Sequence, residues 1–410
     1  MDDRKSIAYC PHCDPYKVRA SHIPNRIMNM LSLPWLMFPS VTHTRIAPSF
    51  LYTFANRFFN KAFVRGLLTV RVLQEVNASD DDEGLYNRSL VVVREARKQG
   101  VHIKAIKLLG KTGTGLYSME RNGKKVIFDG LPHADIEEPL THDFSDKNKL
   151  KHFLHSKNVP YPHGKVFKHH KSAIQFVEKE LGFPVVVKPP TGSLSRHTFC
   201  NINTPEELED AVRAVQLISN EFLVEKFIRG DVHRVTVVGG DVLAACRREL
   251  PNVVGDGKHT IRELIEIKNQ HLLRGEHHQK NYTLKKISLN DKTIGILKQQ
   301  GMTFDHILPK DKKVYLHDKL VLSAGADIHD VTDVMHRENI QMFERVYDAC
   351  GSRVIGVDFI AQDISMPYYE QNCGVIEVNG VPYIDMHHYP VTGKSRNVAG
   401  AIVNQVLKEL

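Results

Sequence analysis

The sequence predicts an α/β protein with more than one domain, and three observations support this. The chain has 410 residues. A domain with a single hydrophobic core is usually smaller than this, so two or three domains are expected. Hydrophobic residues make up 42% and charged residues 25% of the chain, which is close to average soluble usage and disfavours disordered, collagen-like and membrane proteins. From residue 85 to Leu410, short apolar runs alternate with segments of helical periodicity.

The N-terminal part, residues 1–84, is predicted to be a helical, basic extension of unknown role. Its segment "FLYTFANRFFNKAFVRGLL" reads as one or two amphipathic helices, and the charge run "NASDDDEG" at 77–84 marks a linker. The apolar stretch "IMNMLSLPWLMF" is broken by Pro34 and is shorter than the roughly 20 residues that a membrane-spanning helix needs. No membrane span is therefore expected.

Residues 85–140 are predicted to form a small α/β domain. The segment "SLVVVREARKQG" reads as a helix that ends at Gly100, and "VHIKAIKLL" alternates as a strand does. The dipeptide Asn122-Gly123 within "SMERNGKKVIF" predicts a hairpin with a type I′ turn.

From residue 141 onward, strands alternate with helices up to Leu410, and we divide this part at residue 228 into 141–228 and 229–410. The helical segments include "KSAIQFVEKELG", "TPEELEDAVRAVQLIS" and the stretch from Arg337 to Gly351. We find no internal repeat and no low-complexity tract.

Charge and cysteine content narrow the function classes. The net charge of +8 and the pI near 9.0 suit nucleic acid, membrane surfaces or small anions such as nucleotides. Lys and Arg are scattered and there is one Trp, so the basic, aromatic-rich surface of a nucleic-acid binder is not indicated. The six cysteines form no compact disulfide pattern and the start lacks a secretory apolar core, so a cytoplasmic protein is expected.

Two short motifs resemble known sites but fit them poorly. The segment "LLGKTGTG" has Ala105 where a Walker A loop needs glycine, and it leads into a predicted hairpin where that loop would open a helix. The pair Cys10 and Cys13 has zinc-ligand spacing, but the next cysteine is at position 200. We interpret both as non-functional in these roles.

The C-terminal third carries polar residues on apolar strands. Asp358 interrupts "VIGVDFIAQDI", and Glu377 and Asn379 interrupt "CGVIEVNGVPYIDMHHY". Period two puts Glu377 and Asn379 on one face and Val378 on the other. Buried acids need a cation or another partner, and Mg²⁺ prefers such oxygen ligands. The alternative is a structural ion pair with a nearby Lys or Arg.

Two further strands end on residues that suit a nucleotide. The run "FPVVVKPP" places Lys188 at a strand tip, where its charge could meet a phosphate. The run "EFLVEKFIRG" reads as a second apolar strand and as a sheet edge whose free backbone groups could bind adenine. Each feature is common and is weak evidence by itself.

Taken together and in order, these segments resemble an ATP-grasp ligase, and more closely the ATP-grasp domain of cyanophycin synthetase and of the fused bifunctional glutathione synthetases. They span about residues 140 to 405. The segments that carry the resemblance are "SDKNKLKHFLHSKNVPYPHG", "LGFPVVVKPPTG", "FLVEKFIRG", "RRELPNVVGDGKHTIRELI", "DIHDVTDVMH", "GVDFI" and "GVIEVNGVPYIDMH".

The resemblance implies the ATP-grasp fold, in which two α+β lobes clasp ATP. The small α/β domain at 85–140 would then be a pre-ATP-grasp domain. Residues 141–228 would be the first part of the ATP-grasp domain with its ATP lid, and 229–410 the C-terminal lobe with the metal and substrate site.

The resemblance also implies roles for individual residues. Lys147 and Lys188 match the two lysines on the ATP phosphates, and Arg248 matches an arginine beside the reacting phosphate, so Lys188 and Arg248 are the expected catalytic residues. The other expected nucleotide contacts are Gly192, Ser193, Ser195 and Arg196 of the lid, the adenine-binding hinge of Glu225, Lys226, Phe227 and Ile228, and Asp231. The expected Mg²⁺ ligands, with Mn²⁺ as an alternative ion, are Asp358, Glu377 and Asn379; the expected substrate contacts are Ser323, Gly325 and Asp385.

This chain departs from the relatives at several of these positions. Ser193, Ser195 and His197 stand where small residues or glycine are usual in the lid, so turnover is in question. The ribose-binding acid falls at Val232, with Asp231 as its substitute. Asp385 stands where the relatives carry a basic residue, which favours an acceptor with a positive charge or an extra amine.

The resulting prediction is an ATP- and Mg²⁺-dependent carboxylate–amine ligase that forms an amide or peptide bond through an acyl phosphate. Its substrates would be small carboxylates and amines, possible homo-oligomerisation is left open, and no nucleic-acid partner is expected. Because the chain stops at Leu410 and has no Mur-ligase-like half, a single ligation is favoured over a two-reaction polymerase. The alternatives are a catalytically weakened ATP-binding regulatory or scaffold protein and, third, nucleic-acid binding through the N-terminal 76 residues.

Overall fold

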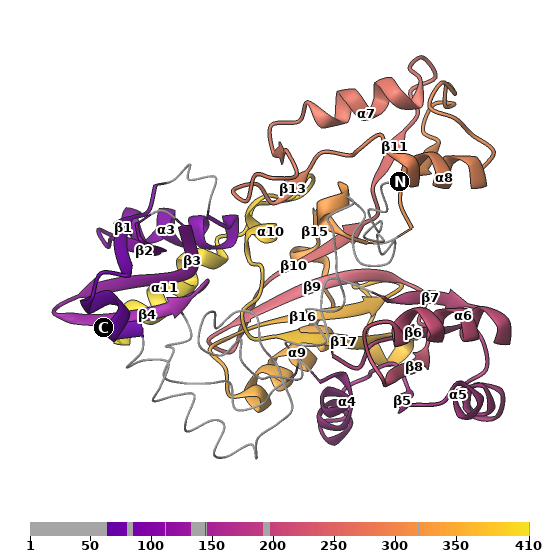
Figure 1. Cartoon of the computed structure of the whole chain (residues 1–410), viewed down its shortest axis with the longest axis horizontal. Coiled ribbons are helices and arrows are strands. Elements are labelled where there is room, and N and C mark those ends of the chain that lie inside the picture. Colours follow the sequence, from indigo (N-terminus) through magenta and orange to yellow (C-terminus); the bar gives the residue numbers. More distant parts are fainter. Residues whose placement is uncertain are drawn as a thin grey trace, which may run out of the picture. The chain divides into compact units, whose positions relative to one another are not determined.

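The computed structural model of the chain describes residues 64–79, 85–110, 112–132, 144, 146–191, 197–318 and 320–409. The chain divides into two units, which we describe separately; Figure 1 labels their helices and strands. The first unit contains Asp143–Gly230 and Asn372–Glu377; the second contains Asp231–Gln371, Val378–Leu410 and the described part of Ala47–His142. The predicted amphipathic helices before residue 64, the Cys10/Cys13 pair and the lid residues Gly192, Ser193, Ser195 and Arg196 lie outside the described residues.

The first unit is built on an antiparallel four-stranded sheet of order β5-β8-β6-β7. Its strands are β5 (Gly164–Phe167), β6 (Val185–Lys188), β7 (Phe199–Ile202) and β8 (Phe222–Lys226). Its helices are α4 (Lys147–Ser156), α5 (His170–Phe176), which continues as a π-helical turn η3 (Val177–Leu181), and α6 (Pro205–Gln216). These helices begin and end close to the positions that the sequence pattern predicts.

The two central strands of this sheet are β8 and β6. All four residues of β6 are buried, as its continuous apolar run predicts, because β8 covers one side and β7 the other. The sequence prediction that β8 is a sheet edge is wrong, since β5 and β6 pair with it on both sides. The strand's apolar residues were misleading because a short apolar run looks the same at an edge and in the middle.

In the second unit, a helix covers a four-stranded antiparallel sheet near the start of the described chain. The strands follow the order β1 (Leu73–Asn77), β2 (Ile103–Leu108), β3 (Thr112–Arg121) and β4 (Lys124–Asp129), and the helix is α3 (Asn87–Lys98). The predicted turn is confirmed: Asn122 and Gly123 have φ values of 53° and 77° between the paired residues Arg121 and Lys124.

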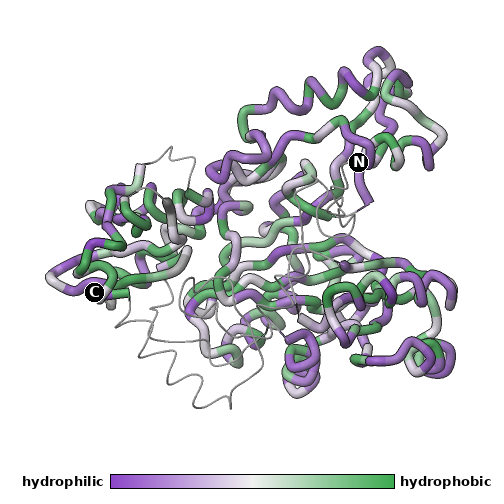
Figure 2. The backbone as a smooth tube through the Cα atoms, viewed as in Figure 1, coloured by the Kyte–Doolittle hydropathy of each residue, from purple (hydrophilic) through white to green (hydrophobic). Residues whose placement is uncertain are grey.

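The larger sheet of the second unit has the order β15-β10-β9-β16-β17. Its strands are β9 (Asp231–Val238), β10 (Asp241–Glu249), β15 (Asp327–Asp330), β16 (Val354–Ala361) and β17 (Gly374–Asn379), of which β17 passes from one unit into the other. Helix α9 (Arg337–Cys350) packs against β9, β10 and β16. Figure 2 shows hydrophobic residues gathered on these central strands.

Between β10 and β15 the chain forms a group of short elements around its own small core of Val253, Ile261, Ile265 and their neighbours. These elements are β11 (Asn252–Val254), α7 (Ile261–Asn269), β12 (Arg274–Gly275), β13 (Leu284–Lys285), α8 (Asp291–Gln299) and β14 (Lys313–Tyr315), followed by the 3-10 turns η4 (Leu322–Ala324) and η5 (Thr332–Val334). Thr260 starts α7 with a complete capping box to Glu263.

Within the second unit, the C-terminal elements pack against elements near the start of the described chain. After η6 (Tyr368–Glu370) and β17 come α10 (Asp385–His388) and α11 (Val398–Glu409), and α11 packs against α3. One hydrophobic cluster joins α3 and β2 to α11 through Leu90, Val93, Ile402 and Val403. Among the described residues, no helix combines the length and apolar character needed to cross a bilayer.

Candidate active site

The two lysines predicted to bind phosphate lie together in the first unit. Lys188 is the last residue of β6, and Lys147 is the first residue of α4. The backbone N–H of Lys147 donates to the carbonyl of Pro190 (3.0 Å), and Asp146 forms a bridge with Thr191. The tip of the strand and the start of the helix are therefore tied to each other directly before the lid segment.

A buried carboxylate organises the lysines. Glu225 on β8 forms ion pairs with Lys188 and, at 2.8 Å, with Lys151 on α4. Burial alone would raise the pKa of Glu225, but the charges of Lys188 and Lys151 outweigh burial and lower the pKa. Glu225 is thus an anion that fixes two cations on neighbouring elements.

The electrostatic environment of Lys147 favours the binding of an anion. Burial and the nearby charge of Lys188 lower the pKa of Lys147 to about 8, against the opposing charges of Glu377 and Glu225. An added phosphate would relieve both effects, since it supplies negative charge where two lysines approach each other. The influence of Glu377 also places this predicted metal ligand near the lysine pair within the first unit.

The predicted adenine hinge follows β8 directly. The N–H groups of Lys226 and Phe227 already donate to the carbonyls of His163 (2.8 Å) and Pro184 (3.1 Å). The Lys226 side chain turns toward the carbonyls of Leu181, Gly182 and Phe183. A base at this hinge would therefore use the carbonyl groups and the backbone of the buried Ile228, and the Lys226 side chain has a structural role.

In the second unit, Asp358 is buried on β16 between two arginines. Arg234 Nε donates to Asp358 Oδ1 (2.5 Å), and Arg248 Nη2 donates to Asp358 Oδ2 (3.0 Å). Burial would raise the pKa of Asp358, but Arg234 and Arg248 lower it. The sequence alternative of a structural ion pair is therefore realised in this structure, and it joins Asp358 to Arg248, the predicted catalytic arginine.

The other predicted metal ligands follow the expected strand period. Glu377 and Asn379 on β17 are half-buried, whereas Val378 between them is buried. Carboxylate and amide oxygens such as theirs are the ligand type that Mg²⁺ prefers. Asp358 is held ionised by its two arginines, and a metal-binding carboxylate must be ionised.

The predicted ribose contact and the predicted substrate contacts differ in burial: two are exposed and two are buried. Asp231 is exposed at the start of β9 and forms a 3.4 Å ion pair with Arg247. Ser323 is exposed in η4. Gly325 has φ +96°, and a Cβ there would lie 2.5 Å from Ile287 Cγ1, so glycine is needed for packing. Asp385 is buried at the start of α10.

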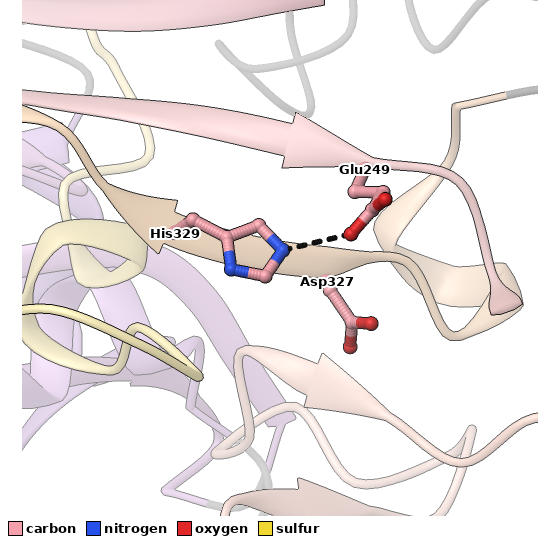
Figure 3. A group of neighbouring side chains, drawn as sticks. All are labelled: Glu249, Asp327 and His329. Atoms are coloured by element: carbon pink, nitrogen blue, oxygen red, sulfur yellow. Dashed lines mark hydrogen bonds and ion pairs between the residues drawn. The ribbon is translucent and has the colours of Figure 1, made fainter. Parts of the chain in front are cut away.

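A separate charged cluster lies at the joined ends of β10 and β15 (Figure 3). Glu249 accepts hydrogen bonds from Lys313 (2.6 Å) and from His329 Nε2 (3.0 Å). Asp327 accepts from Lys268 (2.5 Å) and Arg274. Each carboxylate oxygen thus already meets a donor, so we interpret the cluster as a structural network, although its three side chains have the types and spacing of metal ligands.

Sequence reasoning missed several of these partners. Lys151 lies one helical turn after Lys147, and Arg234 lies directly opposite Asp358 in the register of β9 and β16. Helical spacing could have indicated Lys151. Arg234 could have been found only by knowing that β9 and β16 are neighbours.

Comparisons with known proteins agree with this architecture. Residues 144–257 match the model of the RimK-like ATP-grasp domain. The chain is 35% identical over 325 residues to a cyanophycin synthetase of Crocosphaera subtropica, covering 79% of this chain and 36% of that protein. It is 33% identical over 270 residues to the glutathione biosynthesis bifunctional protein of Streptococcus mutans, covering 65% of this chain and 36% of that protein.

Solved structures give the same result for the fold. A bifunctional glutathione synthetase from Pasteurella multocida matches with a TM-score of 0.61 and 26% identity, covering 80% of this chain and 44% of that one. The chain spans 36% of the length of each of the two curated relatives named above. Residues 144–257 are therefore similar to a RimK-like ATP-grasp domain, and the chain has the ATP-grasp fold.

Proposed function

We propose that this protein is an ATP- and Mg²⁺-dependent carboxylate–amine ligase that forms an amide or peptide bond. The observation that carries the proposal is the lysine pair at the tip of β6 and the start of α4, in which Glu225 holds Lys188 by an ion pair and the charge of Glu377 acts on Lys147. Paired cations beside a carboxylate that can hold a metal suit a triphosphate. The curated relatives named as synthetases support the same class of reaction.

The chemistry needs positioning more than a nucleophilic side chain. In the first step, a substrate carboxylate oxygen attacks the γ-phosphorus of ATP, the bond to the bridging oxygen breaks, and ADP leaves. In the second step, an amine nitrogen attacks the acyl carbon, the carbon–oxygen bond to phosphate breaks, and the nitrogen loses a proton. Both steps build negative charge on phosphate oxygens, which fixed cations stabilise.

The chain's own residues supply that charge stabilisation. Lys147 and Lys188 would bind phosphate oxygens, with Lys188 kept in place by Glu225. Arg248 would neutralise charge on the transferred phosphoryl group. Asp358, Glu377 and Asn379 would hold Mg²⁺, or Mn²⁺ in its place, and the ion would shield the triphosphate charge. The hinge around Ile228 would receive adenine.

The buried cysteines Cys246 and Cys350 are free thiols, and this supports a reaction that takes place in the cytoplasm. Burial raises the pKa values of Cys246 and Cys350 to about 12. Such thiols are unreactive at neutral pH, so a covalent cysteine mechanism is not part of the proposal.

The test is phosphate release from ATP and Mg²⁺ with pooled small carboxylates and amino acids, followed by mass analysis of the products. Release that needs a substrate pool, with an adduct of condensation mass, is the expected result. Glu377→Ala should abolish release, whereas replacing the exposed Glu370 by Gln should leave it unchanged. Nucleotide binding without release in any pool would overturn the ligase proposal and favour a regulatory ATP-binding protein.

A further inference from the structure

A buried polar relay in the second unit joins three segments that are far apart in the sequence. Asn87 Nδ2 donates to Thr283 Oγ1 (2.8 Å), and Thr283 Oγ1 donates to Asp385 Oδ2 (2.5 Å). Asn87 begins α3, Thr283 directly precedes β13, and Asp385 begins α10. The small N-terminal α/β domain therefore contributes directly to the surroundings of Asp385.

The relay leaves two acceptor atoms unused. Asp385 and Asn87 are 4% and 5% exposed, and in the described part of the chain Asp385 Oδ1 and Asn87 Oδ1 have no hydrogen-bond partner. A buried polar atom without a partner costs about 1–3 kcal/mol. Two such atoms at the ends of one relay are unexpected unless another molecule supplies donors.

The cations Arg88, Arg234 and Lys285 each interact electrostatically with Asp385, and in the described part of the chain Arg88 Nε has no hydrogen-bond partner of its own. Arg88 lies over the ring of Tyr383, with Cζ 4.7 Å from the ring centroid, and its Nη1 donates weakly to the carbonyl of Val381 (3.5 Å). Lys285 donates to the carbonyl of Gln279. Burial raises the pKa of Asp385, although the hydrogen bond from Thr283 and the charges of Arg88 and Arg234 oppose this effect. Within the residues that the structure describes, none of these cations forms an ion pair with the Asp385 carboxylate.

We infer that Asp385, with Asn87 and Thr283, binds a cationic group of the amine substrate. Both unused atoms are acceptors, so the ligand must bring N–H donors, and an ammonium or guanidinium group brings them together with positive charge. A phosphate or carboxylate would instead bring acceptors, with which neither unused atom can form a hydrogen bond. This inference rests on the proposed ligase function and specifies its substrate class.

The bound cation is not the amine that reacts. A carboxylate that holds an ammonium group favours its protonated form, and a protonated nitrogen has no lone pair with which to attack the acyl phosphate. The substrate therefore carries a second amine that stays neutral and reacts. The substrate class is a diamine or a basic amino acid.

The experiment compares L-lysine with L-norleucine, which has the same chain length but lacks the side-chain amine, as acceptors for the full-length protein. The wild-type protein should use lysine with a kcat/KM at least tenfold higher. Asp385→Asn should remove most of that preference through KM for lysine, while the KM for ATP stays unchanged. Equal use of the two acceptors by the wild type, or an unchanged preference in Asp385→Asn, would overturn the inference.

A second arm separates this inference from the ligase proposal. Calorimetric titration of L-lysine into wild-type protein with a non-hydrolysable ATP analogue measures binding without turnover. Binding that is at least tenfold weaker in Asp385→Asn and in Thr283→Val supports the site even if no ligation is found. Equal affinity for lysine and norleucine in the wild type rejects the site, and this result needs no variant to fold.

Discussion

Replacing Glu225 by Gln should strongly destabilise the first unit, because Glu225 is the shared partner of Lys151 and Lys188. The change keeps the shape of the side chain but leaves two largely buried ammonium groups without their counter-ion. Breaking a buried ion pair by removing one partner typically costs about 3–5 kcal/mol. A lysine can instead give up its proton, which at pH 7 costs about 4.6 kcal/mol from an ordinary pKa near 10.4. We therefore expect a loss of about 3–5 kcal/mol.

The pH dependence distinguishes this mechanism from simple loss of packing. Burial already lowers the pKa of Lys151, and in the variant Lys151 also lacks its counter-ion, so the unfolded chain binds more protons and stability rises with pH. At pH 9 the cost of removing one proton falls to about 1.9 kcal/mol. The stability loss should therefore shrink by roughly 2–3 kcal/mol per deprotonated lysine between pH 7 and pH 9.

Urea unfolding followed by circular dichroism at both pH values measures these quantities. The matched control is Glu178→Gln, which makes the same chemical change at an exposed position of the same unit. A Glu225→Gln variant as stable as this control would refute the argument that Glu225 holds the lysines. A loss of the same size at pH 7 and pH 9 would show that the lysine charges are not its cause.

Three further predictions concern single residues. Because the pKa of Lys147 is about 8, Lys147 loses its proton as the pH rises, and ATP affinity measured by calorimetry should fall about eightfold from pH 7.5 to 9.0. The Lys147→Arg variant should show a flatter pH profile of ATP affinity. An equally steep profile in this variant would contradict the role of Lys147. Arg248→Ala should lower single-turnover phosphoryl transfer by about 10²–10³ with little change in ATP affinity, and a loss of affinity alone would argue against a role in the reaction. Gly325→Ala should cost about 1–3 kcal/mol more than Gly301→Ala in thermal unfolding, since both glycines have positive φ but only the first would place a Cβ against Ile287; equal costs would reject the packing argument.

Local patterns predicted local structure well. The type I′ turn at Asn122 and Gly123 depends on backbone preferences of two adjacent residues, and the alternation around Val378 depends on strand period alone. The helix from Arg337 to Cys350 was also visible as an apolar stripe. Each of these features is determined within a few residues of sequence.

Partners across the fold were not predictable in the same way. Glu225 was predicted as part of an adenine hinge, and the ion pairs of its side chain with two lysines on α4 and β6 were not predicted. The arginines around Asp358 come from β9 and β10, and the relay at Asp385 needs residues from about 100 and 300 positions earlier in the chain. A single sequence does not contain the strand order that brings such residues together.

The hydrophobic cluster between α3 and α11 limits which fragments of this protein can be produced as separately folded pieces. Leu90 and Val93 near one end of the described chain share a core with Ile402 and Val403 near the other. An isolated fragment starting at residue 141 would expose the apolar side of α11 to water, and one ending before residue 398 would do the same to α3. Helix α3 and the sheet of β1 to β4 are therefore no independent module, and engineering that exchanges or deletes them must include α11 as well.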